Sequence, residues 1–385
     1  MIRLPDQAVR LTALGVAEPG TDQLDAVARA ALHDPAATVS GAVAAPADYA
    51  FTSIATGGLY RVAGTAGTST GTASWSSFVK VLQHARHWPL IAMFPPEAAS
   101  ELLALFPWKD ELTVREQVLP VLPQGLRVPD VYFVADLGDD RLAVWMEDID
   151  VDDEPWDLET YARAAHLLAR LAARRGPGDP AGTCDLPPGF AVRKVVESRA
   201  ATVADLLGDD AVWERPLVAG TVDACYRGDL RRAVDRLPQL IAEMDTLPSS
   251  LPHGDAAPVN LLRPRDEPGT FVLIDWGFGC QLPLGFDIGQ LLVGEVERGA
   301  MEPQRLPALH DLLVAAYVDG LAEEGVDLDA STVRRGSLSS LGPRTLLGAF
   351  PVELTDGTVT DEHVAFLRRR AALGRFVLDL VLGGV

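Results

Sequence analysis

The pattern of apolar and polar positions changes near residue 150, and this change divides the chain into two parts. In the first part, short apolar runs alternate with turns, which is typical of β-strands. We expect strands on both sides of a turn that contains Gly57 and Gly58, and a third strand after a flexible, exposed connection at Gly64–Ser74. The segment DELTVREQVLPVL then predicts a helix, and LGDD separates two further apolar runs as the turn of a β-hairpin.

In the second part, apolar positions recur with the period of helices. WDLETYARAAHLLARLAARR follows Pro155, which suits a first helical turn, and its final arginines suit the negative end of the helix dipole. Similar patterns indicate further helices at about 192–207, 228–246, 304–323 and 361–382.

These patterns predict an α+β fold in two lobes. Residues 49–148 form a small antiparallel β lobe with one helix, and residues 149–385 form a larger, mainly α-helical lobe. Residues 1–48 are an alanine-rich N-terminal extension with an amphipathic helix at Asp22–Leu32, and we assign this extension no role.

Composition and charge narrow the class of protein. The chain has 385 residues, of which 48% are apolar and 23% charged, as in a soluble globular protein of about two domains. No apolar run approaches the roughly 20 residues of a membrane span, and the start MIRLPDQAVR lacks a signal peptide, so we expect a cytoplasmic protein without membrane contact. The formal charge of −21 disfavours nucleic acid as a partner and favours a cationic small molecule. Cys184, Cys225 and Cys280 lack CxxC spacing, which favours buried free thiols.

Polar side chains that can act in catalysis or metal binding interrupt the apolar segment LPHGDAAPVNLL. This segment holds His253, Asp255 and Asn260, and downstream the run FVLI predicts a buried strand that ends at Asp275. Two carboxylates and one amide supply a base and two oxygen ligands. Mg²⁺ prefers oxygen ligands, and nucleotide phosphates would complete its coordination, as phosphoryl transfer requires. A helix cap or an Asx-turn at Asp255 and Asn260 is the alternative.

The order and spacing of these residues resemble a known family. H-G-D-x-x-P-x-N at 253–260 and I-D-W at 274–276 are similar to the motifs of the aminoglycoside phosphotransferases and their choline-kinase-like relatives. Ala256 and Ala257 depart from it, because members often carry larger residues there. The resemblance extends over about residues 49–292 and implies a protein-kinase-like fold. It also implies that ATP, or alternatively GTP, binds together with Mg²⁺ and supplies the γ-phosphoryl group.

The resemblance implies a role for each polar residue of this region. Asp255 would be the catalytic base that faces the acceptor hydroxyl, and Asn260 and Asp275 would bind Mg²⁺. His253 would support the loop, and Asp287, in the segment FDIGQLL, would brace it.

The first part of the chain holds candidates for nucleotide binding. A kinase-like lobe needs a strand lysine that holds phosphates and a helix glutamate that orients it. Lys80 in SSFVKVL and Glu116 in TVREQVL are these candidates; a lysine that reaches to solvent and a surface ion pair with Arg115 are the alternatives. Gly57 and Gly58 would close over the phosphates, or they form an ordinary hairpin turn.

The segment AVWMEDI resembles the hinge whose backbone contacts adenine, and Met146, Glu147 and Asp148 would occupy it. Together, these residues predict a kinase that phosphorylates a hydroxyl of an aminoglycoside-like molecule, an amino alcohol or another small metabolite. A nucleotide-binding module of pseudokinase type and a metal-dependent hydrolase are the competing classes. The sequence indicates neither the acceptor nor the oligomeric state.

Overall fold

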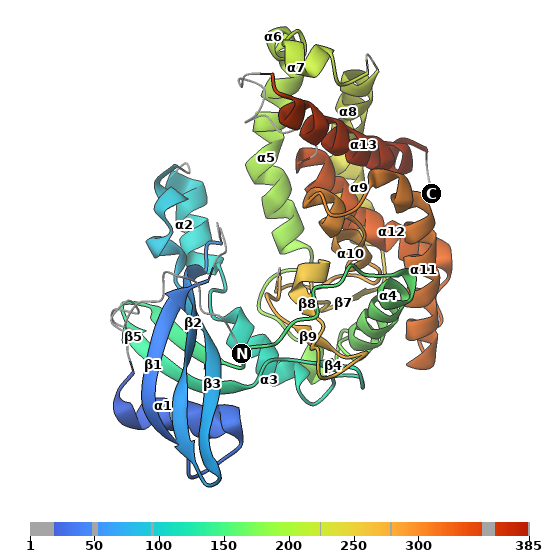
Figure 1. Cartoon of the computed structure of the whole chain (residues 1–385). Coiled ribbons are helices and arrows are strands. Elements are labelled where there is room, and N and C mark those ends of the chain that lie inside the picture. Colours follow the sequence, from blue (N-terminus) through green and yellow to red (C-terminus); the bar gives the residue numbers. More distant parts are fainter. Residues whose placement is uncertain are drawn as a thin grey trace. The chain divides into compact units, whose positions relative to one another are not determined.

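The computed structural model describes residues 19–47, 53–93, 96–223, 225–277, 279–348 and 359–383. The chain forms two compact units. Figure 1 shows the chain, coloured from its N-terminus to its C-terminus. The first unit contains residues up to Thr113 and residues Val128–Val151, and the second contains Val114–Arg127 and the chain from Asp152 onward. Across the described ranges, no helix has both the length and the apolar character needed to cross a membrane.

A five-stranded antiparallel sheet forms the core of the first unit, with the strand order β1-β2-β3-β6-β5. The strands are β1 (Thr38–Pro46), β2 (Thr56–Thr68), β3 (Gly71–Gln83), β5 (Val131–Gly138) and β6 (Arg141–Met146). The amphipathic helix predicted near Asp22 is confirmed as α1 (Thr21–Leu32), and it packs its apolar side on this sheet. The described part of the N-terminal extension therefore belongs to the β unit. The boundary predicted at Tyr49 separated β1 and α1 from their sheet, and Tyr49 itself lies outside the described residues.

The long hairpin of β2 and β3 replaces two predicted features. Gly57 and Gly58 lie inside β2, at an irregularity of its pairing with β3, so the prediction of a glycine turn at these residues is wrong. The flexible connection predicted at Gly64–Ser74 is wrong as well, because only Ser69 and Thr70 lie outside the two strands. The predicted exposure is confirmed for seven of the eleven residues of this segment, whereas Ala66 is buried. Gly64 approaches β1 so closely that a Cβ atom there would lie 2.1 Å from the carbonyl oxygen of Gly41.

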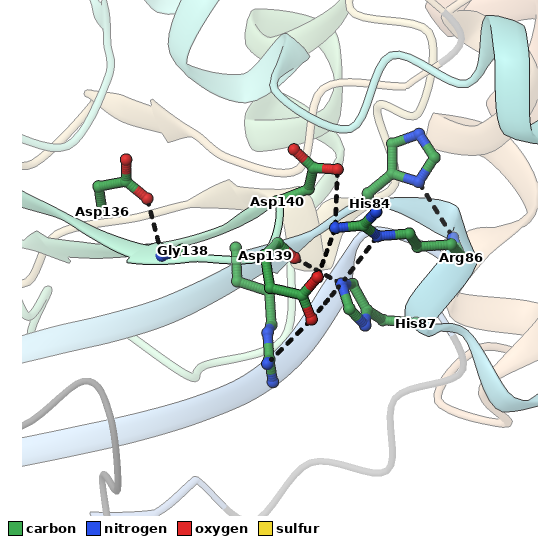
Figure 2. A network of polar contacts seen from close by, with 8 residues as sticks. His84, Arg86, His87, Asp136, Gly138, Asp139 and Asp140 are labelled. Carbon is green, nitrogen blue, oxygen red and sulfur yellow. Dashed lines mark hydrogen bonds and ion pairs between the residues drawn. The ribbon is translucent and has the colours of Figure 1, made fainter.

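The hairpin predicted from LGDD is confirmed, and its turn is fixed by a polar network (Figure 2). Asp139 and Asp140 have φ angles of 53° and 52°, which a two-residue turn of type I′ requires. One guanidinium nitrogen of Arg86 lies 2.6 Å from a carboxylate oxygen of Asp139 and 3.0 Å from one of Asp140. His87 contacts the backbone oxygen of Asp139 as well. Asp139 and Asp140 therefore serve the turn.

Between β3 and β5, the chain forms the 3₁₀ segments η2 (Ala85–His87) and η3 (Pro89–Met93), then α2 (Pro96–Leu105) and α3 (Asp110–Val118). The helix predicted from DELTVREQVLPVL is confirmed as α3.

The second unit is mainly helical, as predicted. Its helices are α4 (Leu158–Ala173), α5 (Phe190–Gly208), α6 (Asp210–Trp213), α7 (Pro216–Ala219), α8 (Tyr226–Asp235), α9 (Leu237–Met244), α10 (Ile288–Glu297), α11 (Leu306–Glu323), α12 (Ala330–Ser340) and α13 (Asp361–Gly383). A π-helical segment, η7 (Leu341–Leu346), follows α12. The pattern at 228–246 divides into α8 and α9 because Pro238 has no backbone N–H for a continuous helix.

Short strands connect these helices. β4 (Leu126–Arg127), β9 (Phe271–Leu273) and β8 (Leu261–Leu262) form one small sheet, and β7 (Ser249–Ser250) pairs with β10 (Leu282–Pro283). In the helical core, α11 packs closely on α4, because Gly320 brings its backbone against the carbonyl oxygen of His166.

The three cysteines are free thiols, as predicted, but their burial differs from the prediction. Cys280 is buried, Cys184 is half-buried and Cys225 is exposed. The prediction that all three are buried is therefore wrong.

Candidate active site

The two strands β8 and β9 place the predicted metal ligands side by side. Asn260 directly precedes β8, and Asp275 lies two residues after β9. The strands are antiparallel, with Leu261 opposite Leu273, and the backbone N–H of Ile274 donates to the carbonyl oxygen of Asn260 at 3.1 Å. This register brings Asn260 next to Asp275, although they are far apart in the sequence.

Asp287 holds the start of the loop that carries Asp255. Its two carboxylate oxygens accept hydrogen bonds from the backbone N–H groups of Gly254, at 2.8 Å, and of His253, at 3.1 Å. Asp287 is buried, and this burial raises the pKa of its carboxyl group to about 6, against the lowering effect of the two hydrogen bonds. A buried carboxylate that satisfies two backbone donors fixes the conformation of the loop.

His253 is also buried, and its ring is stacked on that of Trp276 with 4.6 Å between the centroids. Its Nδ1 atom accepts a hydrogen bond from the backbone N–H of Asp255 at 3.3 Å. Burial lowers the pKa of His253 to about 4, so the ring is neutral near pH 7. The imidazole therefore packs under the loop and brings no positive charge to the reaction.

Two close backbone contacts shape the loop at Gly254 and Gly277. Gly254 has a φ angle of +83°, and a Cβ atom on it would lie 2.2 Å from the carbonyl oxygen of Gly277. The N–H of Gly277 in turn donates to the carbonyl oxygen of His253 at 2.9 Å. These contacts join the loop to the segment that follows Asp275, and they leave no room for a side chain at Gly254.

The side chain of Asn260 faces Asp255. Its Nδ2 atom lies 2.8 Å from the backbone oxygen of Asp255 and 3.2 Å from Oδ2 of the same residue. Both partners are acceptors, so the amide nitrogen must face them, and the amide oxygen Oδ1 points elsewhere. This oxygen and the carboxylate of Asp275 are two donors of the type that Mg²⁺ prefers.

The donor set fits a metal ion that is shared with a phosphate ligand. Among the described residues, no group of three or more His, Cys, Asp or Glu side chains could hold a metal ion on its own. Mg²⁺ commonly binds through one or two protein ligands, with waters and phosphate oxygens in the remaining positions. Asp275 has a φ angle of 53°, an uncommon conformation for a residue that is not glycine. Such strained residues cluster at functional sites.

Arg344 is a contact of Asp255 that the sequence did not reveal. In η7, its Nη2 atom lies 2.7 Å from Oδ1 of Asp255, and its Nη1 atom donates to the carbonyl oxygen of Gly254 at 3.0 Å. The guanidinium group therefore fixes both the carboxylate and the backbone that precedes it. No motif of the sequence signals this contact, because 89 residues separate Arg344 from Asp255.

Arg175 is a second arginine that reasoning from the sequence placed differently. The sequence assigned it to the dipole at the end of α4, but its side chain is buried in the second unit. It donates to the carbonyl oxygen of Ala181 at 2.9 Å, and its guanidinium carbon lies 5.4 Å from the centroid of the Trp276 ring. Arg175 thus supports the ring on which His253 packs.

In the first unit, Lys80 has a different glutamate partner from the one predicted. The Nζ atom of Lys80, on β3, lies 2.6 Å from a carboxylate oxygen of Glu111, in the first turn of α3. Glu116 is exposed. Five residues correspond to about 140° around an α-helix, so Glu111 and Glu116 face different sides of α3. The assignment of Glu116 as the partner of Lys80 is therefore corrected to Glu111.

This correction leads to a matched test. If the pair positions nucleotide phosphates, Glu111→Gln should raise the KM for ATP about tenfold, because Lys80 loses the charge that orients it. Glu116→Gln removes the same charge from the same helix and should leave the KM unchanged. Steady-state kinetics with varied ATP would compare the two variants. Equal effects of both substitutions would contradict the assignment of Glu111.

The remaining candidates for nucleotide binding, the two glycines and the predicted hinge, also lie in the first unit. Gly57 and Gly58 lie in β2, opposite the end of β3 that carries Lys80. The backbone oxygen of Met146 accepts a hydrogen bond from the Ser77 hydroxyl at 2.8 Å, and the N–H of Glu147 donates to the carbonyl oxygen of Asp130 at 2.8 Å.

Asp148 completes the predicted hinge, and its carboxylate forms an ion pair with Arg61 at 2.9 Å. No contact of these hinge residues identifies adenine as their ligand, so this role stays a prediction.

Comparison with known proteins assigns the family. The model of the phosphotransferase enzyme family, APH, matches residues 72–324, which include β3 from its second residue onward, the loop at Asp255 and Asp275. The chain belongs to the phosphotransferase enzyme family. The predicted resemblance is thereby confirmed, and this member is an ATP-dependent phosphotransferase that acts on hydroxyl groups. No curated protein is significantly similar to the sequence.

Two solved structures are similar to this phosphotransferase. An aminoglycoside phosphotransferase from Alicyclobacillus acidocaldarius is 12% identical with a TM-score of 0.52, and the match covers 85% of this chain and 90% of that chain. The AMP-bound spectinomycin phosphotransferase APH(9)-Ia is 12% identical with a TM-score of 0.49, and the match covers 97% and 98% of the two chains. The first similarity confirms the predicted fold class, an antiparallel sheet in one unit and a mainly helical second unit.

Proposed function

We propose that this phosphotransferase transfers the γ-phosphoryl group of ATP to a hydroxyl group of a small molecule, with Asp255 as the catalytic base. The observation that carries the proposal is the contact between Asp255 and Asn260, which lies beside Asp275. The proposed base and the two proposed oxygen ligands therefore lie next to one another in the helical unit. Phosphoryl transfer depends mainly on positioning and charge neutralisation, and this group supplies both.

The residues around Asp255 determine how it meets the acceptor. Arg344 and Asn260 each donate to one of its carboxylate oxygens, at 2.7 Å and 3.2 Å. Each carboxylate oxygen has two lone pairs, so an acceptor hydroxyl can still donate to Asp255. We propose that Asp255 orients this hydroxyl and takes its proton as the new bond to phosphorus forms. Asp287 and His253 hold the backbone of the loop during this step.

Asn260 and Asp275 are the residues that would hold Mg²⁺. The metal ion would neutralise phosphate charge, and the donor set supports this because it leaves coordination positions for phosphate oxygens. Lys80, oriented by Glu111, would bind the phosphates in the same reaction. For the acceptor, we propose the wider class of hydroxyl-bearing small molecules, which includes aminoglycosides and amino alcohols.

Asp275→Asn tests the metal site without a known acceptor. The substitution keeps the size of the side chain but removes the charged ligand, so Mg²⁺ should no longer strengthen nucleotide binding. We expect MgATP to raise the Tm of the wild type by several degrees, as ligand binding to the folded state does. The Tm of Asp275→Asn should rise by no more with MgATP than with ATP and EDTA. A variant that retains the full Mg²⁺-dependent shift would contradict the assignment. MgGTP in a parallel titration would reveal which nucleotide is preferred.

A further inference from the structure

Three arginines adjoin the catalytic loop, although the whole chain has a formal charge of −21. We call Arg199, Arg344 and Arg370 the arginine cluster. They come from three elements that pack together in the helical unit: α5, η7 and α13. The convergence of three cations from distant parts of an acidic chain requires an explanation, because like charges repel.

The cluster is centred on Gly348 and Glu297. A Cβ atom on Gly348 would lie 3.5 Å from Nη1 of Arg199 and 3.7 Å from Nη2 of Arg370, so the two guanidinium groups meet there. Nη1 of Arg370 lies 3.7 Å from Oε1 of Glu297, at the end of α10. Arg344 precedes Gly348 by one helical turn and contacts Asp255. The cluster thus reaches from the predicted base to α5.

Helix α10 places Glu297 close to the catalytic loop. A Cβ atom on Gly294, one turn before Glu297, would lie 3.0 Å from the Cβ atom of Ala257 and 3.1 Å from Cδ of Pro258. The cluster therefore lies on the same side of the helical unit as the loop that carries Asp255. Small residues on both surfaces, Gly294 and Ala257, make this close packing feasible.

Within the part of the chain that the structure describes, one arginine of the cluster has no carboxylate partner. Arg344 is paired with Asp255 and Arg370 with Glu297, whereas Arg199 is exposed and forms no ion pair within the described ranges. The buried Nε–H of Arg370 also has no hydrogen-bond partner there. Burial raises the pKa of Glu297, the carboxylate that pairs with Arg370. Among the described residues, two of the three guanidinium groups thus have a carboxylate partner, and that of Arg199 has none.

We propose that the acceptor carries an anionic group, a carboxylate or a phosphate, and that Arg199 and Arg370 bind this group while Asp255 faces the hydroxyl. This inference rests on the proposed phosphoryl transfer and narrows its substrate. Guanidinium groups match the planar, bidentate geometry of carboxylates and phosphates. A cationic acceptor would instead meet the cluster with an unfavourable charge.

The inference revises the expectation drawn from the total charge. A net charge of −21 favours cations at long range, but at physiological ionic strength such interactions are screened beyond about 8 Å. A bound acceptor responds to the groups near it, and the arginine cluster lies on the same side of the helical unit as the loop of Asp255. The arginine cluster thus presents positive charge on a molecule whose total charge is negative.

Inorganic phosphate is the first probe. Calorimetric titration of phosphate into the full chain, with the nucleotide site saturated by MgADP, should show saturable binding to the wild type. Arg199→Ala should weaken it about tenfold, the usual effect of losing one charge-assisted contact. Arg193→Ala is the matched control, because Arg193 lies on the same helix and pairs with Asp245. Glu297→Gln should strengthen binding, since it removes the opposing charge. Absence of saturable binding, or equal binding by wild type and Arg199→Ala, would overturn the inference.

Four small molecules with a common scaffold then distinguish the sources of the anion: glycerate, glycerol 3-phosphate, glycerol and 3-amino-1,2-propanediol. At least one of the two anions should bind about tenfold more tightly than the neutral and cationic molecules, and the tighter one identifies carboxylate or phosphate. Equal or tighter binding of the amino diol would refute the proposal. The Mg²⁺-dependent shift with ATP is measured on the same samples. If that shift is present and Arg199 has no effect on anions, only the acceptor inference fails; loss of the shift itself would count against the proposed kinase.

Discussion

Asp255→Asn should lower the kcat for phosphoryl transfer about 10³-fold, the usual contribution of a general base, while nucleotide binding stays close to that of the wild type. Asparagine preserves the size of the side chain and can still accept a hydrogen bond from Arg344, which lies 2.7 Å from Oδ1. It cannot accept a proton from the acceptor at neutral pH. The substitution therefore separates proton transfer from the position of the loop.

A panel of hydroxyl acceptors, assayed for ATP-dependent phosphorylation, provides the measurement. Asp311→Asn is a suitable control, because Asp311 also pairs with an arginine, at 2.6 Å from Arg334, but lies on the exposed side of α11. We expect this control to keep wild-type kcat. Near-normal turnover by Asp255→Asn would remove Asp255 from the catalytic role and would favour a mechanism that depends on positioning alone.

Gly254→Ala should destabilise the protein by about 3 kcal/mol and abolish most activity. Part of this cost, about 1 kcal/mol, arises because alanine is strained at a φ angle of +83°. The rest arises because the new Cβ atom would lie 2.2 Å from the carbonyl oxygen of Gly277, so the backbone must move. The N–H of Gly254 donates to Asp287, and its displacement would also weaken this brace.

Gly325→Ala separates the two contributions. Gly325 has a φ angle of +79°, close to that of Gly254, but a Cβ atom there would meet nothing within 4 Å. Denaturant unfolding should give a loss of about 1 kcal/mol for Gly325→Ala, from backbone strain only. If the two variants lost equal free energy of unfolding, the close contact of Gly254 with Gly277 would contribute nothing to the loss of stability.

The elements that were predicted correctly depend on residues that lie close together in the sequence. The turn at Asp139 and Asp140 needs residues that tolerate positive φ, and α1 and α11 repeat apolar residues with helical period. The motif around Asp255 was found for a related reason, because its residues lie close together along the chain. The hairpin at Gly64–Ser74 was missed because its order depends on packing against β1, a contact that composition does not reveal.

The missed site residues depend on tertiary contacts. Glu111 and Glu116 are both glutamates of the same helix, so the sequence does not distinguish them. Only the orientation of α3 selects Glu111 as the partner of Lys80. Arg344 belongs to a segment, LGPRTL, that has no charge pattern of its own. Its role depends on the position of η7 beside the loop, which follows from the packing of α12 and α13.

The backbone of η7 has a further consequence for helical register. A π-helical turn closes with hydrogen bonds between residues i and i+5, so it contains one residue more than an α-helical turn. One extra residue rotates every following side chain by about 100° relative to a continuous α-helix. Arg344 lies inside this segment, so the direction of its side chain toward Asp255 depends on the wider turn. The positive charge beside the base thus depends on a single extra residue in the backbone, which a one-residue deletion could remove without any change to the loop of Asp255.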